Sequence, residues 1–157
     1  QIRDALLAAS GELRQRTGGP SVGEDVPRRS LYLQSYRNKM DTFLHAFDVA
    51  GGLKSVAQRN TTTTPTQSLL MINGDYALAR ARKLAERLKA MGWTEPPELL
   101  AHAMRIVWGR SPTLEEMAAS LDFLGVNPEQ KADEIDEAKL IDFCHILFNS
   151  NEFLYVD

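Results

Sequence analysis

The sequence contains one cysteine, Cys144, and this lack of a second thiol excludes an internal disulfide. A Cys-x-x-Cys-His motif is also missing, so no c-type haem attaches to this segment. No apolar run reaches the roughly 18 residues that a transmembrane helix needs. A Gly-rich phosphate loop, a Gly-x-Ser-x-Gly elbow and a His-Glu-x-x-His zinc motif are likewise absent. The sequence therefore shows no standard catalytic motif, and Cys144, inside an apolar stripe, is interpreted as a buried hydrophobe.

The overall amino-acid composition is typical of a globular domain. The chain has 157 residues, of which 43% are hydrophobic and 25% are charged. A domain of this length buries about 70% of its unfolded surface, which suffices for a core without disulfides. Helix-like patterning begins at residue 1, so we expect no signal peptide here and a chain taken from a longer protein.

Charge is distributed unevenly along the chain. Residues 1–110 carry 16 basic and 10 acidic side chains, a net +6, whereas residues 111–157 carry 2 and 11, a net −9. The acidic segment could bind a separate partner or could dock on the basic part of the same chain. We favour docking within the chain, because it requires no partner.

Apolar residues recur with helical spacing along most of the chain, which predicts an all-α fold, an irregular bundle of about six helices. The pattern places helices at residues 2–9, 39–48 and 66–72, then, after an interruption at residues 73–75, a longer helix to about residue 91, and further helices at residues 96–108, 114–124 and 136–149. The last of these is the most apolar and is predicted to be central. Two of the predicted core faces are Ile2, Ala5, Leu6 and Ala9, and Leu114, Met117, Ala118 and Leu121. Thr113 and Glu116 predict a capping box.

The same pattern suggests one helical domain with an unusual beginning. We expect residues 1–36 to form an extended arm, or the remnant of a longer domain, and residues 37–157 to form the helical core. Residues 17–28 are predicted to be irregular, and residues 30–34 to be a lone strand or an extended arm. The threonine-rich residues 58–66 favour an extended segment, and Pro65 fits the first turn of the helix that follows.

Six ordered blocks together resemble a known family, the planctomycete secreted, cytochrome-associated domain of unknown function, family fifteen fifty-three. The blocks are Gly18-Gly19-Pro20-Ser21; Arg28-Arg29-Ser30-Leu31-Tyr32-Leu33 with Arg37-Asn38; Phe47-Asp48; Arg59-Asn60 through Thr64-Pro65-Thr66-Gln67-Ser68-Leu69 to Asn73; Gly109-Arg110-Ser111-Pro112-Thr113 with Glu116; and Asn149-Ser150-Asn151-Glu152-Phe153. The chain resembles the C-terminal part of that longer domain. Ala50-Gly51-Gly52 departs from the turn expected there.

The resemblance implies an extracytoplasmic bacterial protein, periplasmic or secreted, connected with polysaccharide use or electron transfer. It implies upstream domains of the same protein as partners, a c-type haem domain among them. It supplies no catalytic residue, and we expect no cofactor bound by this chain. Nucleic acid is not expected as a partner, because the basic stripe of Arg80, Lys83 and Arg87 lacks stacking aromatics.

One group of polar residues is a candidate binding cluster, because it gathers where the helical periodicity is poorest. It comprises Arg37, Asp48, Arg59, Asn60, Thr66, Gln67 and Asn73. These side chains could bind a sugar-like ligand through amides and guanidiniums. They could instead provide hydrogen bonds to the backbone of a long irregular segment, and we favour this second interpretation. Arg59 in particular is expected to be buried and bonded to backbone carbonyls or to Asp48.

A second group, Asp41, His45 and Asp48, falls on one predicted helix face at a spacing that could ligate a metal. No fourth ligand is evident, so we expect no metal there. His145 with Asp142 is expected to form a surface hydrogen bond.

The sequence thus favours a non-catalytic structural or interaction module. The alternative is a carbohydrate-binding or hydrolytic unit whose site is completed by upstream residues. At the C-terminus we expect residues 149–151 to end the last helix and Phe153 and Tyr155 to pack back on the bundle, with Glu152 accepting hydrogen bonds from backbone amides or from an arginine.

Overall fold

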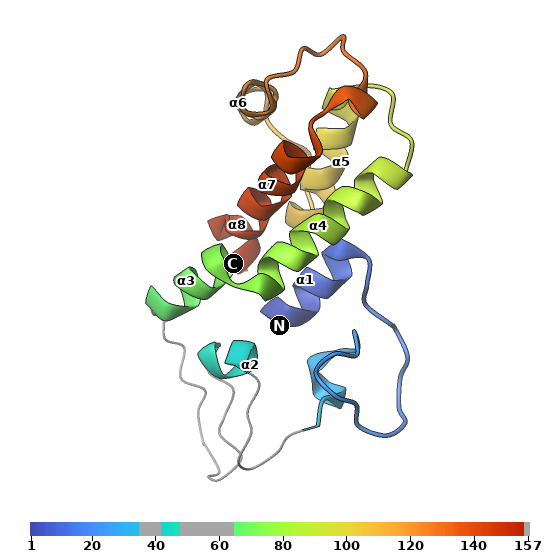
Figure 1. Ribbon diagram of the computed structural model, residues 1–157, viewed down its shortest axis with the longest axis vertical. Coiled ribbons are helices and arrows are strands. Elements are labelled where there is room, and N and C mark those ends of the chain that lie inside the picture. Colours follow the sequence, from blue (N-terminus) through green and yellow to red (C-terminus); the bar gives the residue numbers. More distant parts are fainter. Residues whose placement is uncertain (35–41, 48–64, 156–157) are drawn as a thin grey trace.

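The computed structural model describes residues 1–34, 42–47 and 65–155, and confirms an all-α bundle (Figure 1). The helices are α1 (Ile2–Ser10), α2 (Thr42–Ala46), α3 (Pro65–Asn73), α4 (Asp75–Ala90), α5 (Pro96–Trp108), α6 (Leu114–Leu124), α7 (Glu137–Phe148) and α8 (Asn151–Leu154). Two short 3-10 turns, η1 (Ser30–Tyr32) and η2 (Ala132–Glu134), complete the described elements.

Helices α4 and α7 run side by side at the centre of the bundle (Figure 1). The inward face of α4 includes Ala77 and Ala81, and these small side chains allow a close approach between helices. Phe148 and Leu140 of α7 are fully buried. Helices α1, α5 and α6 pack around this pair, which confirms the prediction that the last long helix is central.

Two of the predicted core faces are wrong in part. Ala5 is exposed, and the buried face of α1 includes Leu7 and Ser10 instead. In α6 Leu114 is 91% exposed and Ala118 is also exposed. The fully buried residues of α6 are Ser120 and Leu124, and the predicted Met117 and Leu121 are partly buried and pack against the core.

The helix ends follow local signals in the sequence. The predicted capping box is confirmed: the Glu116 amide donates to Thr113 Oγ1 at 3.2 Å, and the Thr113 amide donates to the Glu116 carboxylate at 2.7 Å. Helix α3 begins at Pro65, one residue before the predicted start, and this proline lies in the first turn as predicted. Helix α5 ends at Trp108 and is followed by Gly109, whose φ of 76° is a left-handed conformation that favours glycine.

The first 34 residues begin with a helix that is part of the bundle, which differs from the extended arm expected for residues 1–36. Helix α1 packs against α4, and Leu6 lies in the common core. The segment after α1 is irregular, as predicted, and forms isolated parallel bridges between Arg14 and Arg28 and between Val22 and Leu33. Residues 30–34 therefore contribute a 3-10 turn and a single bridge.

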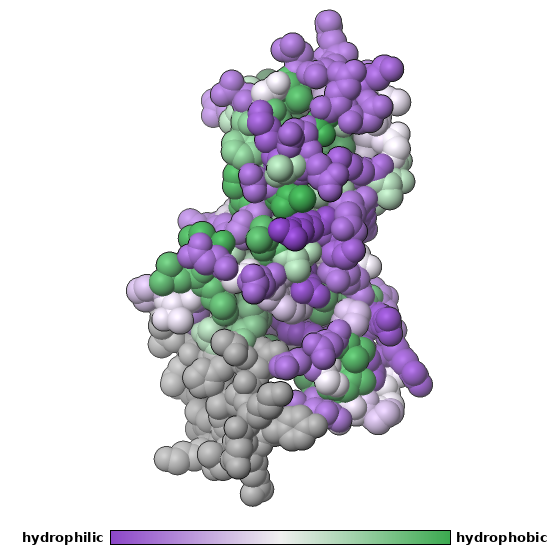
Figure 2. All heavy atoms as spheres, in the orientation of Figure 1, coloured by the Kyte–Doolittle hydropathy of each residue, from purple (hydrophilic) through white to green (hydrophobic). Residues whose placement is uncertain are grey.

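The surface is mainly polar in the view of Figure 2, and apolar side chains gather on it where α3 and α8 lie. Leu69 and Ile72 of α3 are more than half exposed, as is Ile146 of α7. Among the described helices, none combines the length and apolar character needed to span a bilayer.

Candidate functional site

Three residues of the predicted polar cluster lie within the described part of the chain. Thr66 is exposed in the first turn of α3. Gln67 is half-buried in the same turn, and Asn73 is exposed as the last residue of that helix. A separation of six helical residues places them about 9 Å apart along the axis and on different faces. The two side chains therefore do not converge. Arg37, Asp48, Arg59 and Asn60 lie outside the described residues, so the cluster, including the expected burial of Arg59, stays a prediction.

The predicted metal-ligating triad cannot be compared with the structure, because Asp41, Asp48 and the side chain of His45 lie outside the described part of the chain. Within the described ranges, no group of three or more His, Cys, Asp or Glu side chains is arranged to hold a metal ion.

The first polar network that the structure does describe is centred on Arg28, which is only 5% exposed. Its guanidinium donates to three backbone carbonyls, those of Pro20 at 3.1 Å, Arg16 at 3.0 Å and Gly18 at 2.6 Å. The same guanidinium stacks over the ring of Tyr32, 4.2 Å from its centroid. Arg28 thus provides the hydrogen bonds that an irregular segment cannot make by itself.

Arg3 extends this network from α1. It is 2% exposed and donates to the carbonyls of Arg28 at 2.7 Å, Glu24 at 3.1 Å and Val26 at 3.3 Å. Asp4, the next residue, accepts from the amide and the hydroxyl of Ser30 at 2.7 and 2.6 Å. One turn of α1 therefore anchors the segment of residues 24–30 on the bundle.

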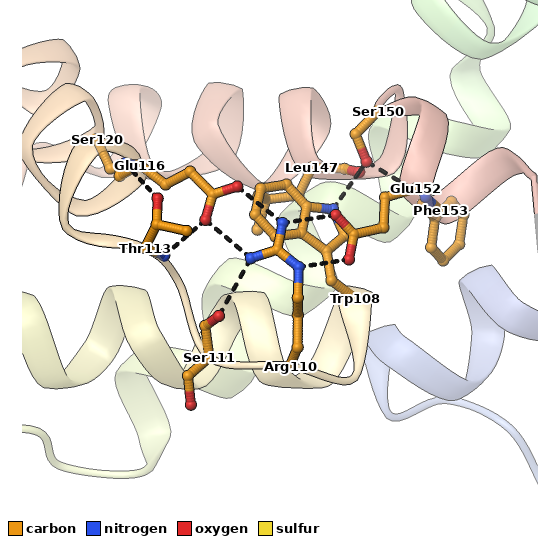
Figure 3. Close-up of polar contacts among 10 residues, drawn as sticks. All are labelled: Trp108, Arg110, Ser111, Thr113, Glu116, Ser120, Leu147, Ser150, Glu152 and Phe153. Carbon is orange, nitrogen blue, oxygen red and sulfur yellow. Dashed lines mark hydrogen bonds and ion pairs between the residues drawn. The ribbon is translucent and has the colours of Figure 1, made fainter.

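A second network is centred on Arg110, in the turn between α5 and α6 (Figure 3). Its guanidinium forms paired hydrogen bonds with Glu116 at 2.7 and 2.8 Å and with Glu152 at 2.7 Å for both bonds. A further bond to the carbonyl of Ser111 at 3.1 Å employs the fifth N–H donor. Arg110 thereby joins the start of α6 to α8.

Trp108 and Ser150 add a neutral contact beside Arg110. The indole Nε1 of Trp108 donates to Ser150 Oγ at 2.7 Å, and the Ser150 hydroxyl donates to the carbonyl of Leu147 at 2.7 Å (Figure 3). Ser150 Oγ also accepts from the amide of Phe153 at 3.4 Å, which caps α8. The guanidinium of Arg110 lies 5.0 Å from the centroid of the Trp108 ring.

Electrostatics in this second network follow from the paired bonds. The hydrogen bonds from Arg110, and then that from the Thr113 backbone, lower the pKa of Glu116 from 4.5 to about 2. The hydrogen bonds to Glu116 and Glu152 raise the pKa of Arg110 above its ordinary value. Arg110 and Glu116 are therefore charged at neutral pH, and neither is poised to transfer a proton there.

The other polar candidates also have structural partners. His145 Nε2 donates to the carbonyl of Met71 at 2.8 Å, so it links α7 to α3 and does not form the expected surface bond to Asp142. Arg87 donates to the carbonyls of Ala8 and Ala9 at the end of α1, and Arg80 lies 3.2 Å from the Glu12 carboxylate. Burial raises the pKa of the Cys144 thiol to about 12, so this thiol stays protonated.

These networks explain four of the six sequence blocks singled out above. Arg28 of one block bonds to Gly18 and Pro20 of another, and Tyr32 Oη accepts from the Gly18 amide at 3.1 Å. Arg110 of a third block bonds to Glu152 of a fourth, 42 residues away. The blocks thus meet in pairs that hold segments of the fold together.

The fold and these paired blocks define a helical module built around arginine contacts. A model of the family described as PSD1, Protein of unknown function (DUF1553), matches residues 1–124, and the chain belongs to this family. No curated protein and no solved structure matches the sequence.

The prediction that Glu152 accepts hydrogen bonds from backbone amides or from an arginine is confirmed for the arginine, which is Arg110. The pairing of Arg28 with the block of residues 18–21 was not predicted. The capping box was visible because its partners are three residues apart. The sequence did not indicate the burial of Arg3, because a charged residue in an amphipathic helix usually lies on the solvent face. The expected docking of the acidic segment is confirmed at Arg110 with Glu116 and Glu152, and at Lys89, 3.3 Å from Glu137.

Proposed function

We propose that this chain is a non-catalytic structural or interaction module of a larger bacterial protein, in which it forms the C-terminal part of a longer domain. The observation that carries the proposal is the use of Arg28 and Arg110. Each of these block residues directs its guanidinium toward groups of the same chain. A ligand would have to compete with those internal partners.

The proposed partner is the upstream part of the same protein, with a c-type haem domain as the expected neighbour. The exposed apolar side chains Leu69 and Ile72 on α3 and Ile146 on α7 support docking on this side of the bundle. Helices α3 and α7 are connected there by the bond from His145 to Met71. The extracytoplasmic location and the planctomycete origin rest on the resemblance of the blocks alone.

Calorimetric titration of this chain with the separately produced upstream region tests the docking. We expect association, weakened in Leu69→Glu/Ile72→Glu and unchanged in Leu114→Glu, which alters a still more exposed leucine on α6. Absence of association, or equal weakening by both variants, would contradict the proposed surface. Fractionation of cells that produce the full-length protein tests the location, and recovery in the cytoplasm would refute it.

A further inference from the structure

Helix α3 contributes little to the core and presents apolar side chains to solvent. Met71 is its fully buried residue, whereas Leu69 and Ile72 are more than half exposed. The helix lies at the edge of the bundle (Figure 1), and none of its side chains is charged. A helix of nine residues with one fully buried side chain has little packing to fix its orientation. Polar contacts must therefore help to hold α3 in place.

Two side chains of α7 and its C-terminal end hold the last turn of α3. The Met71 carbonyl accepts from His145 Nε2 at 2.8 Å and from Asn149 Nδ2 at 3.5 Å. Asn149 Nδ2 also donates to the His145 carbonyl at 2.8 Å, which fixes the amide beside the imidazole. Carbonyls in the last turn of a helix have no partner within the helix, so these bonds satisfy an acceptor that α3 leaves open. We call His145 and Asn149 the α3 clamp.

Gly74 completes the support of α3 from the other side. Its amide donates to the Leu70 carbonyl at 2.9 Å, and a Cβ atom at this position would clash with the same carbonyl oxygen. The close approach at the junction of α3 and α4 therefore requires glycine. With the clamp and this junction, α3 presents Leu69 and Ile72 in a preformed orientation.

The strip of α7 beside α3 adds one apolar and one charged residue to this surface. Asp142, His145, Ile146 and Asn149 are spaced at i, i+3, i+4 and i+7, so they share one face of the helix end. Because His145 and Asn149 bond to α3, Ile146 and Asp142 border the exposed side chains of α3. Asp142 is exposed and has no ion-pair partner among the described residues. The surface thus has an apolar centre and a carboxylate at one edge.

The charges indicate which occupant fits. Anionic lipid headgroups are repelled by residues 111–157, which carry a net charge of −9. A second copy joined through the same surface would bring two copies of Asp142 toward each other, which like-charge repulsion opposes. The complement of the surface is an apolar stripe with a basic edge. An amphipathic helix supplies such a stripe at the spacing i, i+3 and i+4.

From these features we propose that α3 and the end of α7 receive an amphipathic helix of the upstream region with a lysine or arginine at its edge. Its apolar stripe packs on Leu69, Ile72 and Ile146, and the basic side chain faces Asp142. The α3 clamp positions α3 for this contact. The inference rests on the proposed docking function and names the element that docks.

The first test concerns the charged edge, with the separately produced upstream region as the probe. Asp142→Lys should weaken association about fivefold, mainly through a slower association rate, because rim charges act on the encounter. Glu115→Lys is the matched control: it makes the same charge change at an exposed position of α6 and should leave association unchanged. Surface plasmon resonance measures both the affinity and the rate.

The second test concerns the α3 clamp. His145→Leu removes a donor to the Met71 carbonyl and should weaken association roughly tenfold, because binding must then order α3. Hydrogen exchange should become faster in α3 and stay unchanged in α5. His145→Gln keeps an N–H donor and should restore both affinity and exchange.

The outcomes separate this inference from the proposed function. If the parent chain does not associate with the upstream region, the docking proposal is refuted and this inference with it. If the parent associates, the inference alone is overturned when Asp142→Lys binds like the parent or no worse than Glu115→Lys. It is also overturned when His145→Leu changes neither affinity nor exchange, or when His145→Gln behaves like His145→Leu.

Two further measurements address the other occupants of the surface. Sedimentation of the chain alone should show a monomer, and the chain should not bind vesicles of phosphatidylcholine. Dimerisation or vesicle binding that Leu69→Glu/Ile72→Glu abolishes would assign the surface to a second copy or to lipid, and would overturn the proposal.

Discussion

Arg28 and Arg110 each join two segments of the chain, but they do so with different chemistry. Arg28 is 5% exposed and binds neutral carbonyls, whereas the Arg110 side chain is 40% exposed and binds carboxylates. Removal of a buried guanidinium leaves buried carbonyls without a hydrogen-bond donor, which lowers stability strongly. An exposed ion pair is weakened by water and salt, so its loss costs less. The N-terminal network should therefore govern stability, and the C-terminal network should respond more to pH and salt.

The strongest test of this comparison is Arg28→Ala. The substitution removes the donor from three carbonyls and should lower the free energy of unfolding by about 3 kcal/mol or more. The adjacent Arg29→Ala is a matched control, since Arg29 is 64% exposed and 3.9 Å from Asp4, and should change stability by less than about 0.5 kcal/mol. Urea denaturation followed by circular dichroism measures both, and similar losses would refute the buried role of Arg28.

The Arg28 network also shows what a sequence can and cannot predict here. The helices were predictable because their apolar spacing is local, and α4, α5 and α7 agree with it closely. The partners of Arg28 lie 8 to 12 residues away and those of Arg3 lie 21 to 25 residues away, in a segment with no periodicity. Such pairings depend on the path of the chain in space, which residue spacing does not encode.

The same limit explains the errors in the predicted faces. Periodicity indicates which residues of α6 share a face, but the neighbours of α6 determine how much of that face is covered. Leu114 lies at the uncovered end of the helix and remains exposed. A groove lined by residues 88–99 and 131–133 was not predicted either, because these two segments lie about 40 residues apart in the sequence.

The next test concerns the aromatic residues of the C-terminal tail. The ring of Phe153 lies 5.2 Å from that of Phe148, so packing of this residue on the bundle is confirmed. The parallel prediction for Tyr155 is wrong, because its side chain is 52% exposed, beyond the end of α8.

Phe153→Ala should therefore cost about 2 kcal/mol, and Tyr155→Ala less than about 0.5 kcal/mol. Thermal unfolding of both variants measures the difference. Equal destabilisation would mean that the tail packs as a unit, with Tyr155 contributing as much as Phe153.

Ser150 tests the neutral part of the C-terminal network. Ser150→Ala removes the acceptor of Trp108 Nε1 and the cap of α8, and should cost about 1 kcal/mol. Ser68→Ala, at an exposed position of α3, is the control and should be close to neutral. The fluorescence of Trp108 should change only in the Ser150 variant. An unchanged emission spectrum with unchanged stability would show that this contact does not order α8.

The smallest change in stability is expected when the pH is lowered, and this change best separates the two networks. Because the pKa of Glu116 is lowered from 4.5 to about 2 in the folded protein, its contribution to stability is complete above about pH 4.5 and is lost as the pH falls toward 2. Glu116→Gln should remove this contribution, so that stability falls less steeply across that range. The reduction should be modest, since the network is open to water and salt.

Denaturation midpoints measured between pH 2.5 and pH 6 check this, with Glu115→Gln as the control on the neighbouring exposed carboxylate. The Glu115 variant should keep the slope of the parent. In 1 M salt the difference between parent and Glu116→Gln should shrink, because exposed charges are screened over about 3 Å at that concentration. The loss caused by Arg28→Ala should persist in the same salt, since its partners are buried carbonyls. If salt weakened both networks equally, exposure would not be what distinguishes them.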